Sequence, residues 1–194
     1  EDGSVGRIPD SLTTVFHTAA GREVRDGGGI SPDKEVKSEK FPNILFYLVN
    51  DNLIFDYATD YCLKHPSIVS VEEFKVTDED YNEFKEKVKK ADFKYDRQSE
   101  KVLKNLKEVA EFEGYMDDAS EEFKALENKL KHNLDRDLDH FAKDIKLLIA
   151  QEIIKRYYYQ AGAIKEQLKS DDDVEEALKI LNDRPEYQKL LAGK

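Results

Sequence analysis

The chain has 194 residues, 39% of them hydrophobic, which is enough for one sizeable core and too little for several large ones. Its 31 Lys and Arg stand against 42 Asp and Glu, and the formal net charge of -11 disfavours binding to nucleic acid or to an anionic lipid surface. No apolar run approaches the roughly 18 residues of a membrane span, and the single cysteine, Cys62, excludes an internal disulfide and a cysteine-based metal cluster.

Residues 1–37 hold most of the nine glycines and two short stretches of β-type residues, at 12–16 and 23–25. Gly21 lies between these stretches and can supply the positive φ of a tight turn. The pattern predicts a β-hairpin over about residues 12–25. Because a two-stranded ribbon is only marginally stable alone, we expect it to pack on a sheet or helix outside this sequence.

From Phe41 onward the apolar residues recur at helical spacing. Predicted helices begin near Pro42, Leu53, Thr77, Gln98, Ser120, Asp135, Asp171 and Pro185. Thr77 and Asp80 have the spacing of a capping box, and the carboxylates at 171–173 favour a helix N-terminus. The predicted fold is therefore mainly α: a helical bundle-like domain of six to eight helices at 38–194, preceded by the hairpin segment at 1–37.

Two of the predicted helices carry more detailed expectations. The helix over residues 98–113 should turn five apolar residues inward and stop at Gly114: Val102, Leu103, Leu106, Val109 and Ala110. The longest helix, over residues 135–169, should pair Glu152 with Arg156 and weaken or bend at Gly162. At least one of the three tyrosines at 157–159 should enter the core, with its hydroxyl bonded to a partner.

The motifs of catalysis and metal binding are missing from the sequence. There is no Gly-x-Ser-x-Gly, and the histidines at 17, 65, 132 and 140 are scattered. The run Asp135-x-Asp137-x-Asp139 has His140 and Lys146 where a calcium loop needs glycine and glutamate, and the run that starts at Asp171 also fails. Helix capping accounts for both runs, so no catalytic, cofactor-binding or metal-ligating residue is predicted, and a metal-dependent enzyme is the weakest reading.

One segment resembles a known family. Gly21-Arg22 is followed by the glycine run at 27–29 and by Gly29-Ile30-Ser31-Pro32-Asp33. This order is similar to the segment after the catalytic core of carboxy-terminal processing (tail-specific) proteases, where a short strand that would include Val36 follows. The family motif consists of Gly21, Arg22, Gly27, Gly28, Gly29, Ile30, Pro32 and Asp33.

The helical remainder resembles the C-terminal extension of the Bacteroidetes-type members of this family. Three stretches carry the likeness: Tyr-Ala-Thr-Asp-Tyr at 57–61, Phe74 to Asp80, and Arg-Tyr-Tyr-Tyr-Gln at 156–160. The resemblance thus runs from about Ile8 to Leu191 and covers nearly the whole chain.

The resemblance implies a hydrolase with a serine nucleophile and a lysine base. In the family both residues lie upstream of the Gly-Arg hairpin, and so does the PDZ domain that captures substrate C-termini. On that basis the chain is expected to be an inactive C-terminal piece of a periplasmic or cell-envelope protease. Its expected partners are the upstream domains, the parent's protein substrates and other copies of itself, with no cofactor. The alternative from another class is an independent helical interaction module of the cell envelope.

Overall fold

The computed structural model describes residues 8, 10–19, 21–26, 32–36 and 41–192. The chain divides into two compact units: a terminal unit, made of Glu1–Glu39 and Ser170–Lys194, and a central unit, Lys40–Lys169. The predicted boundary near residue 37 stays a prediction.

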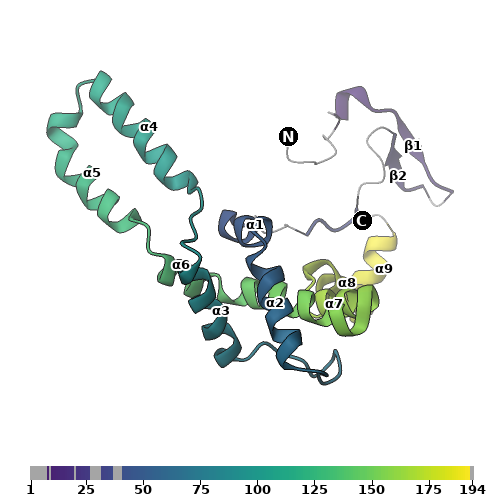
Figure 1. The fold of residues 1–194 in the computed structure, drawn as a ribbon. Helices are drawn as coiled ribbons and strands as arrows, with labels where there is room; N and C mark the ends of the chain where they lie inside the picture. The colour runs from purple at the N-terminus through teal and green to yellow at the C-terminus, as the bar shows by residue number, and fades with distance from the viewer. Residues whose placement is uncertain (1–7, 9, 20, 27–31, 37–40, 193–194) are drawn as a thin grey trace. The chain divides into compact units, whose positions relative to one another are not determined.

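The terminal unit contains a short 3-10 helix, η1 (Asp10–Leu12), and two antiparallel strands, β1 (Val15–His17) and β2 (Glu23–Arg25) (Figure 1). Phe16 pairs with Val24 in the middle of the ribbon. At the turn, the Gly21 N–H donates to the Thr18 carbonyl over 2.9 Å, and Gly21 has a φ of 80°, which glycine adopts without strain. The predicted hairpin is confirmed.

The last two helices, α8 (Asp172–Asn182) and α9 (Arg184–Leu191), also belong to the terminal unit. The Asp171 carboxylate caps α8 by accepting the Val174 N–H over 3.0 Å, and Pro185 lies in the first turn of α9. Both helix starts are as predicted. Their apolar residues are less covered than a bundle would make them, since Leu178 and Leu181 are exposed.

Seven helices form the described part of the central unit. They are α1 (Asn43–Asn50), α2 (Leu53–Lys64), α3 (Asp78–Lys90), α4 (Gln98–Phe112), α5 (Met116–Leu130), α6 (Leu134–His140) and α7 (Ala142–Leu168). The chain is therefore mainly helical with a short N-terminal hairpin, as predicted. The described residues form nine α-helices, where six to eight were expected.

The hydrophobic core of the central unit gathers around α2 and α7, which lie against each other (Figure 1). The side chains that α1, α3, α6 and α7 bury most completely include Ile44, Leu48, Phe84, Val88, Leu138, Ile145, Ile149, Ile153 and Ile154. The loop between α2 and α3 contributes Val71, Phe74 and Val76. The apolar spacing predicted for α3 and for the long C-terminal helix thus marks the residues that build the core.

Helix α3 is fixed at its start by the predicted capping box. The Thr77 hydroxyl accepts the Asp80 N–H over 3.1 Å, and the Asp80 carboxylate accepts the Thr77 N–H over 2.9 Å. From there Tyr81 reaches across the core and donates to the Leu138 carbonyl over 2.6 Å. Burial raises the pKa of Tyr81, so the hydroxyl remains a donor at neutral pH.

Two predicted helix boundaries are wrong. Helix α5 begins at Met116, a turn before Ser120, because the chain re-enters a helix directly after Gly114, whose φ of 80° ends α4. The helix expected over residues 135–169 is two helices, since Phe141 has φ and ψ of -98° and 18° and separates α6 from α7. The apolar periodicity runs through Leu138, Phe141 and Ile145 without a break, which explains the error.

Helix α7 bends at Tyr159 rather than at Gly162. Tyr159 has φ and ψ of 57° and -160°, outside the helical region. A Cβ built on Gly162 would lie 2.4 Å from the Tyr158 Cβ and 2.9 Å from the Ile154 Cγ2. Gly162, three residues after Tyr159, therefore allows the close approach of Tyr158 and Ile154 but is not itself the distorted residue.

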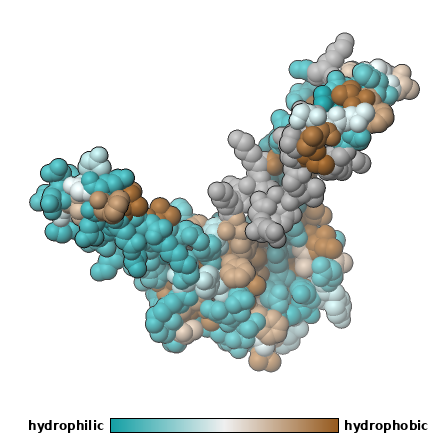
Figure 2. Space-filling model, turned by 90° about the horizontal axis from the view of Figure 1, so that it is seen from above, coloured by the Kyte–Doolittle hydropathy of each residue, from teal (hydrophilic) through white to brown (hydrophobic). Residues whose placement is uncertain are grey.

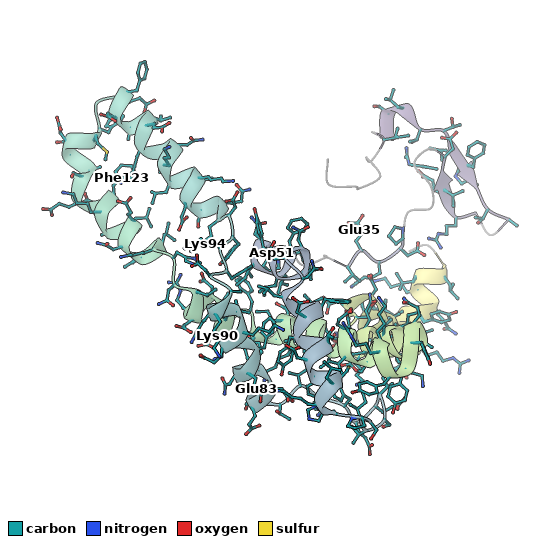
Figure 3. The ribbon with its side chains drawn as sticks, viewed as in Figure 1. Glu35, Asp51, Glu83, Lys90, Lys94 and Phe123 are labelled. Carbon is teal, nitrogen blue, oxygen red and sulfur yellow. The ribbon has the colours of Figure 1, made fainter. Side chains whose placement is uncertain are left out.

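Helices α4 and α5 pack against each other as an antiparallel pair, which we call the helical hairpin (Figure 1). Leu103 and Ala110 are buried between them, and Phe123 of α5 lies on the side toward α4 (Figure 3). Val102, Leu106 and Val109 are exposed, so three of the five residues expected to point inward do not. Periodicity identified the apolar face of α4 correctly, but only part of that face is covered by α5.

Candidate functional site

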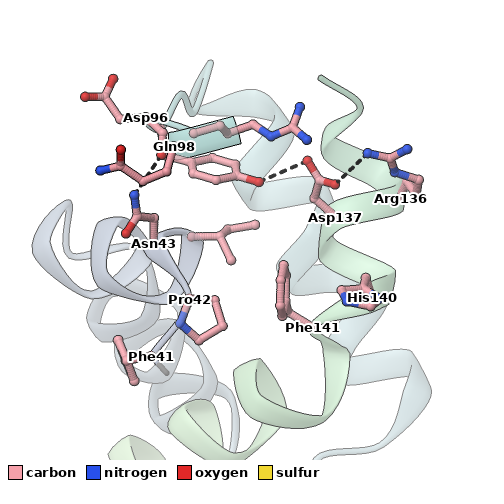
Figure 4. A pocket seen from close by; sticks show the side chains of 12 residues that line it. Phe41, Pro42, Asn43, Asp96, Gln98, Arg136, Asp137, His140 and Phe141 are labelled. Atoms are coloured by element: carbon pink, nitrogen blue, oxygen red, sulfur yellow. Dashed lines mark hydrogen bonds and ion pairs between the residues drawn. The ribbon is translucent and has the colours of Figure 1, made fainter. Parts of the chain in front are cut away.

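A pocket of about 540 Å³ lies where the start of α1, the segment before α4 and the α6–α7 junction meet. Its walls come from Phe41 to Ile44, from Tyr95 to Gln98, and from Arg136, Asp137, His140 and Phe141 (Figure 4). All of these residues lie in the central unit. The pocket therefore brings together three stretches of chain that are distant in sequence.

Asp137 is the polar centre of this pocket and one of two charged residues buried among those described. Its Oδ2 accepts a hydrogen bond from the Tyr95 hydroxyl over 2.9 Å, and its Oδ1 lies 3.4 Å from the Arg136 Nη2 (Figure 4). His132 adds its Nδ1 at 3.5 Å from Oδ2. A buried carboxylate needs such donors, because leaving it unpaired away from water is costly.

Other polar groups of the pocket, on Asn43, Asp96 and Arg97, also have partners within the protein. Asn43 donates to the Asp96 carbonyl over 3.0 Å, and Lys101 lies 2.6 Å from the Asp96 carboxylate. The hydrogen bond from Lys101 lowers the pKa of Asp96. Arg97 donates to the Leu130 carbonyl over 2.7 Å, which ties the start of α4 to the end of α5.

This arrangement is suited to holding helices in place rather than to chemistry. No serine, threonine or cysteine is among the residues that line the pocket, and the Asp137 carboxylate already accepts hydrogen bonds from Tyr95 and Arg136 and lies beside His132. Nucleophilic catalysis needs a nucleophile beside a base. The cluster instead connects the Tyr95 segment to α6, and so fixes both the helical hairpin and α7 relative to the core.

The pocket includes a residue whose role the sequence did not reveal. The run Asp135-x-Asp137-x-Asp139 was attributed to helix capping, but Asn133 caps α6 by accepting the Arg136 N–H over 3.0 Å. Asp135 lies 2.7 Å from Lys89, and Asp139 lies 2.9 Å from Lys85, so both pair with α3. Only Asp137 points inward. Tyr95 is 42 residues away in sequence, and no local signal links the two.

The other features considered from the sequence lie apart from one another. His17 is on β1, His65 follows α2, His132 precedes α6, and His140 is the last residue of α6. Cys62 is a free cysteine of α2. Over the described ranges, no three His, Cys, Asp or Glu side chains gather closely enough to hold a metal ion. None of the helices in that part of the chain is both long and apolar enough to cross a membrane.

The family motif of the terminal unit is described at its two ends. Arg22, next to the turn glycine Gly21, forms an ion pair with Asp33, which follows Pro32. The structure therefore joins the Gly-Arg and Pro-Asp elements that define the motif. Gly27, Gly28, Gly29 and Ile30 lie outside the described residues. Val36, expected in a strand, lies outside β1 and β2, the two strands found among the described residues.

The three helical stretches that carry the resemblance meet in the central unit. The predicted ion pair between Arg156 and Glu152 is confirmed at 2.7 Å. The Arg156 guanidinium also donates to the Phe55 carbonyl over 3.0 Å and to the Thr59 hydroxyl over 3.1 Å, and so joins α7 to α2. The Tyr57 hydroxyl donates to the Asp80 carbonyl over 2.7 Å and so links the stretch from Phe74 to Asp80 to α2.

The tyrosines next to Arg156 continue this junction. The Tyr157 hydroxyl donates to the His65 carbonyl, and its ring packs against the core. Burial raises the pKa of Tyr157 to about 12. The Tyr158 hydroxyl donates to the Val69 carbonyl over 3.1 Å. The expectation that at least one of these tyrosines would be packed, with its hydroxyl bonded, is confirmed by Tyr157.

Comparison with known proteins gives one family. A model described as the probable PDZ-protease, C-terminal helical domain, matches residues 44–181, which is well over half of the chain. No curated protein and no solved structure matches the chain significantly. The matched range covers the junction of α2, α3 and α7 and the Asp137 cluster, the two features that organise the central unit. The chain therefore belongs to the family of C-terminal helical domains of probable PDZ-proteases.

Proposed function

We propose that the chain is the non-catalytic C-terminal part of a carboxy-terminal processing serine endopeptidase, which cleaves exported proteins near their C-termini in the periplasm or cell envelope. The serine nucleophile, the lysine base and the substrate-capturing PDZ domain belong to the upstream part of the parent. The helical part supports the protease, gates access to it or mediates self-association. The motif around Gly21-Arg22 and Pro32-Asp33 supports the serine type, and the family supports the protease.

The observation that carries this proposal is the uncovered apolar face of the β1–β2 ribbon. Phe16 and Val24 are directly paired across the strands, so their side chains lie on the same face. They are 52% and 40% exposed. A two-stranded ribbon needs a sheet or helix to pack on, and its strand edges offer backbone groups for pairing. Both features suit a ribbon that completes the sheet of a catalytic domain.

The test compares substitutions on the two faces of the ribbon, in the isolated chain and in the parent protease. Phe16→Ser with Val24→Ser should lower the parent's melting temperature and its rate of peptide hydrolysis, and leave the melting temperature of the isolated chain unchanged. His17→Ser, on the opposite face, is the matched control. Hydrolysis of an unstructured peptide by the isolated chain, or a parent indifferent to the double substitution, would contradict the proposal.

A second function is favoured by the self-sufficiency of the central unit, whose hydrophobic core includes no described residue of the β1–β2 ribbon. Such a unit could act as an independent helical interaction module of the cell envelope. This alternative requires residues 38–194 to fold and to bind a partner without any protease core. If that truncation unfolds, or binds only when the protease core is present, the alternative fails.

A further inference from the structure

The helical hairpin has one closed side and one open side. On the closed side, Lys107 of α4 lies 2.7 Å from Glu127 of α5, and this ion pair spans the two helices. On the open side, Val102, Leu106 and Val109 of α4 follow one another at spacings of four and three, which places them in one stripe. They remain exposed, with Leu106 and Val109 each 50% exposed.

The second helix extends this open side. Leu126 of α5 is 41% exposed, although Phe123 and Leu130 on the same helix are partly covered. Apolar atoms lie at the surface of this region in Figure 2. Together, Val102, Leu106, Val109 and Leu126 form what we call the open stripe. Two helices cannot enclose a core of their own, and four helices can, so the helical hairpin has the form of half a bundle.

The charges of the helical hairpin are divided sharply along its length. The tip, residues 108–122, has seven acidic residues and no basic one. The base, residues 97–107 and 123–131, has seven basic residues and two acidic ones. The boundary falls between Lys107 and Glu108 on α4 and between Glu122 and Lys124 on α5. The open stripe therefore extends to both sides of the point where the charge changes sign.

This division of charge favours a second copy of the chain as the partner, with its helical hairpin running in the opposite direction. Two hairpins placed with their open stripes together in the same direction would set seven carboxylates against seven. In opposite directions, the acidic tip of each lies on the basic base of the other. A two-fold axis through the middle of the stripe produces the second arrangement and places the same surface on both sides of the interface.

We propose that a second copy of the chain covers the open stripe, so that the two helical hairpins form an antiparallel four-helix bundle about a two-fold axis. On α5, Glu122 precedes Leu126 by four residues and Lys129 follows it by three, so all three share a face. The two-fold axis then brings Glu122 of each copy close to Lys129 of the other. This proposal deepens the proposed role in self-association and rests on that part of the proposed function.

The test measures the mass of the full chain in solution by sedimentation or light scattering over a range of concentrations. We expect a dimer that dissociates on dilution and, because the tip–base contacts are screened, more readily at high salt. Leu106→Gln with Val109→Gln should give a monomer with an unchanged helical circular dichroism spectrum. Leu63→Gln, which replaces an exposed apolar residue of α2 away from the helical hairpin, is the control and should leave the dimer intact.

Charge reversal tests the direction of the two hairpins. Glu122→Lys and Lys129→Glu should each weaken the dimer by at least tenfold, and an equimolar mixture of the two variants should restore it as a heterodimer. Glu121→Lys and Lys124→Glu change the same charges on other faces of α5 and should have little effect. A chain that is monomeric at all concentrations, or single reversals that leave the dimer unchanged, would overturn the proposal. Either result is read without a protease assay, so the proposed protease origin is tested separately.

Discussion

Tyr159 holds a backbone conformation that glycine adopts far more easily than tyrosine. Its φ of 57° and ψ of -160° lie in a region where a side chain costs on the order of 1–3 kcal/mol. The residue is 78% exposed, so its side chain contributes little packing in return. We therefore predict that Tyr159→Gly raises the free energy of unfolding by about 1 kcal/mol, after the greater chain entropy of glycine is subtracted. Urea unfolding measures the difference.

The neighbouring glycine provides the converse experiment. In a straight helix Gly162→Ala would be stabilising by roughly 1 kcal/mol. Here the new Cβ would approach the Tyr158 Cβ to 2.4 Å, so the same substitution should destabilise. If Gly162→Ala were stabilising and Tyr159→Gly destabilising, helix α7 would have to be straight at this point.

Asp137 allows a prediction that separates the three carboxylates of one run. Asp137→Ala should lower the free energy of unfolding by about 1–3 kcal/mol, because the Tyr95 hydroxyl and the Arg136 guanidinium lose their acceptor. Asp135→Ala and Asp139→Ala remove only exposed pairs with lysine and should each cost less than about 1 kcal/mol. Equal effects at the three positions, measured by urea unfolding, would contradict the structural role of Asp137.

At the scale of elements, α3 is held to its neighbours by ion pairs whose strength depends on pH. Asp60 of α2 lies 2.5 Å from Lys87, and Asp78 at the start of α3 lies 2.6 Å from Lys146 of α7. The hydrogen bonds from these lysines lower the pKa of both carboxyls. A carboxyl whose pKa is lowered by folding stabilises the fold at pH values above its unfolded pKa of about 3.9. This contribution is lost as the pH falls through the pKa of the folded state.

The expected result is a loss of thermal stability below about pH 4 that depends on these two residues. At pH 7 the variant Asp60→Asn with Asp78→Asn should have a lower melting temperature than the unsubstituted chain. Between pH 4 and pH 2 its melting temperature should decrease less than that of the unsubstituted chain. Glu111→Gln is the control, since its carboxylate has no ion pair among the described residues. A double variant whose acid sensitivity equals that of the unsubstituted chain would exclude these pairs as its source.

The elements that could be predicted are those set by local chemistry. The Thr77 and Asp80 capping box, the Gly114 stop, the Asp171 cap and the turn at Gly21 each follow from a few adjacent residues, and each is found where expected. The separation of α6 from α7 could not be predicted, because Phe141 continues the apolar spacing through the break. The bend at Tyr159 has no marker at that residue, and Gly162 indicates it only indirectly.

At the scale of the whole molecule, the sequence identified the family segments but not how they meet. Nothing in the spacing shows that Arg156 contacts Thr59, which lies 97 residues away, or that Tyr95 bonds to Asp137. The open stripe was missed for a related reason. The period of apolar residues on α4 shows which face is apolar, but it does not show whether another element of the same chain covers it.

The last prediction concerns the central unit as an independent folding unit. The central hydrophobic cluster consists of residues from Ile44 to Tyr157, and Phe84 within it is completely buried. Residues 40–169 should therefore unfold cooperatively without the rest of the chain, with a denaturant midpoint close to that of the full chain. Phe84→Ala should remove about 3–5 kcal/mol in the full chain and in the truncated one alike. A truncated chain without a cooperative transition, or one in which Phe84→Ala has no effect, would mean that residues 1–39 and 170–194 are part of the same folding unit.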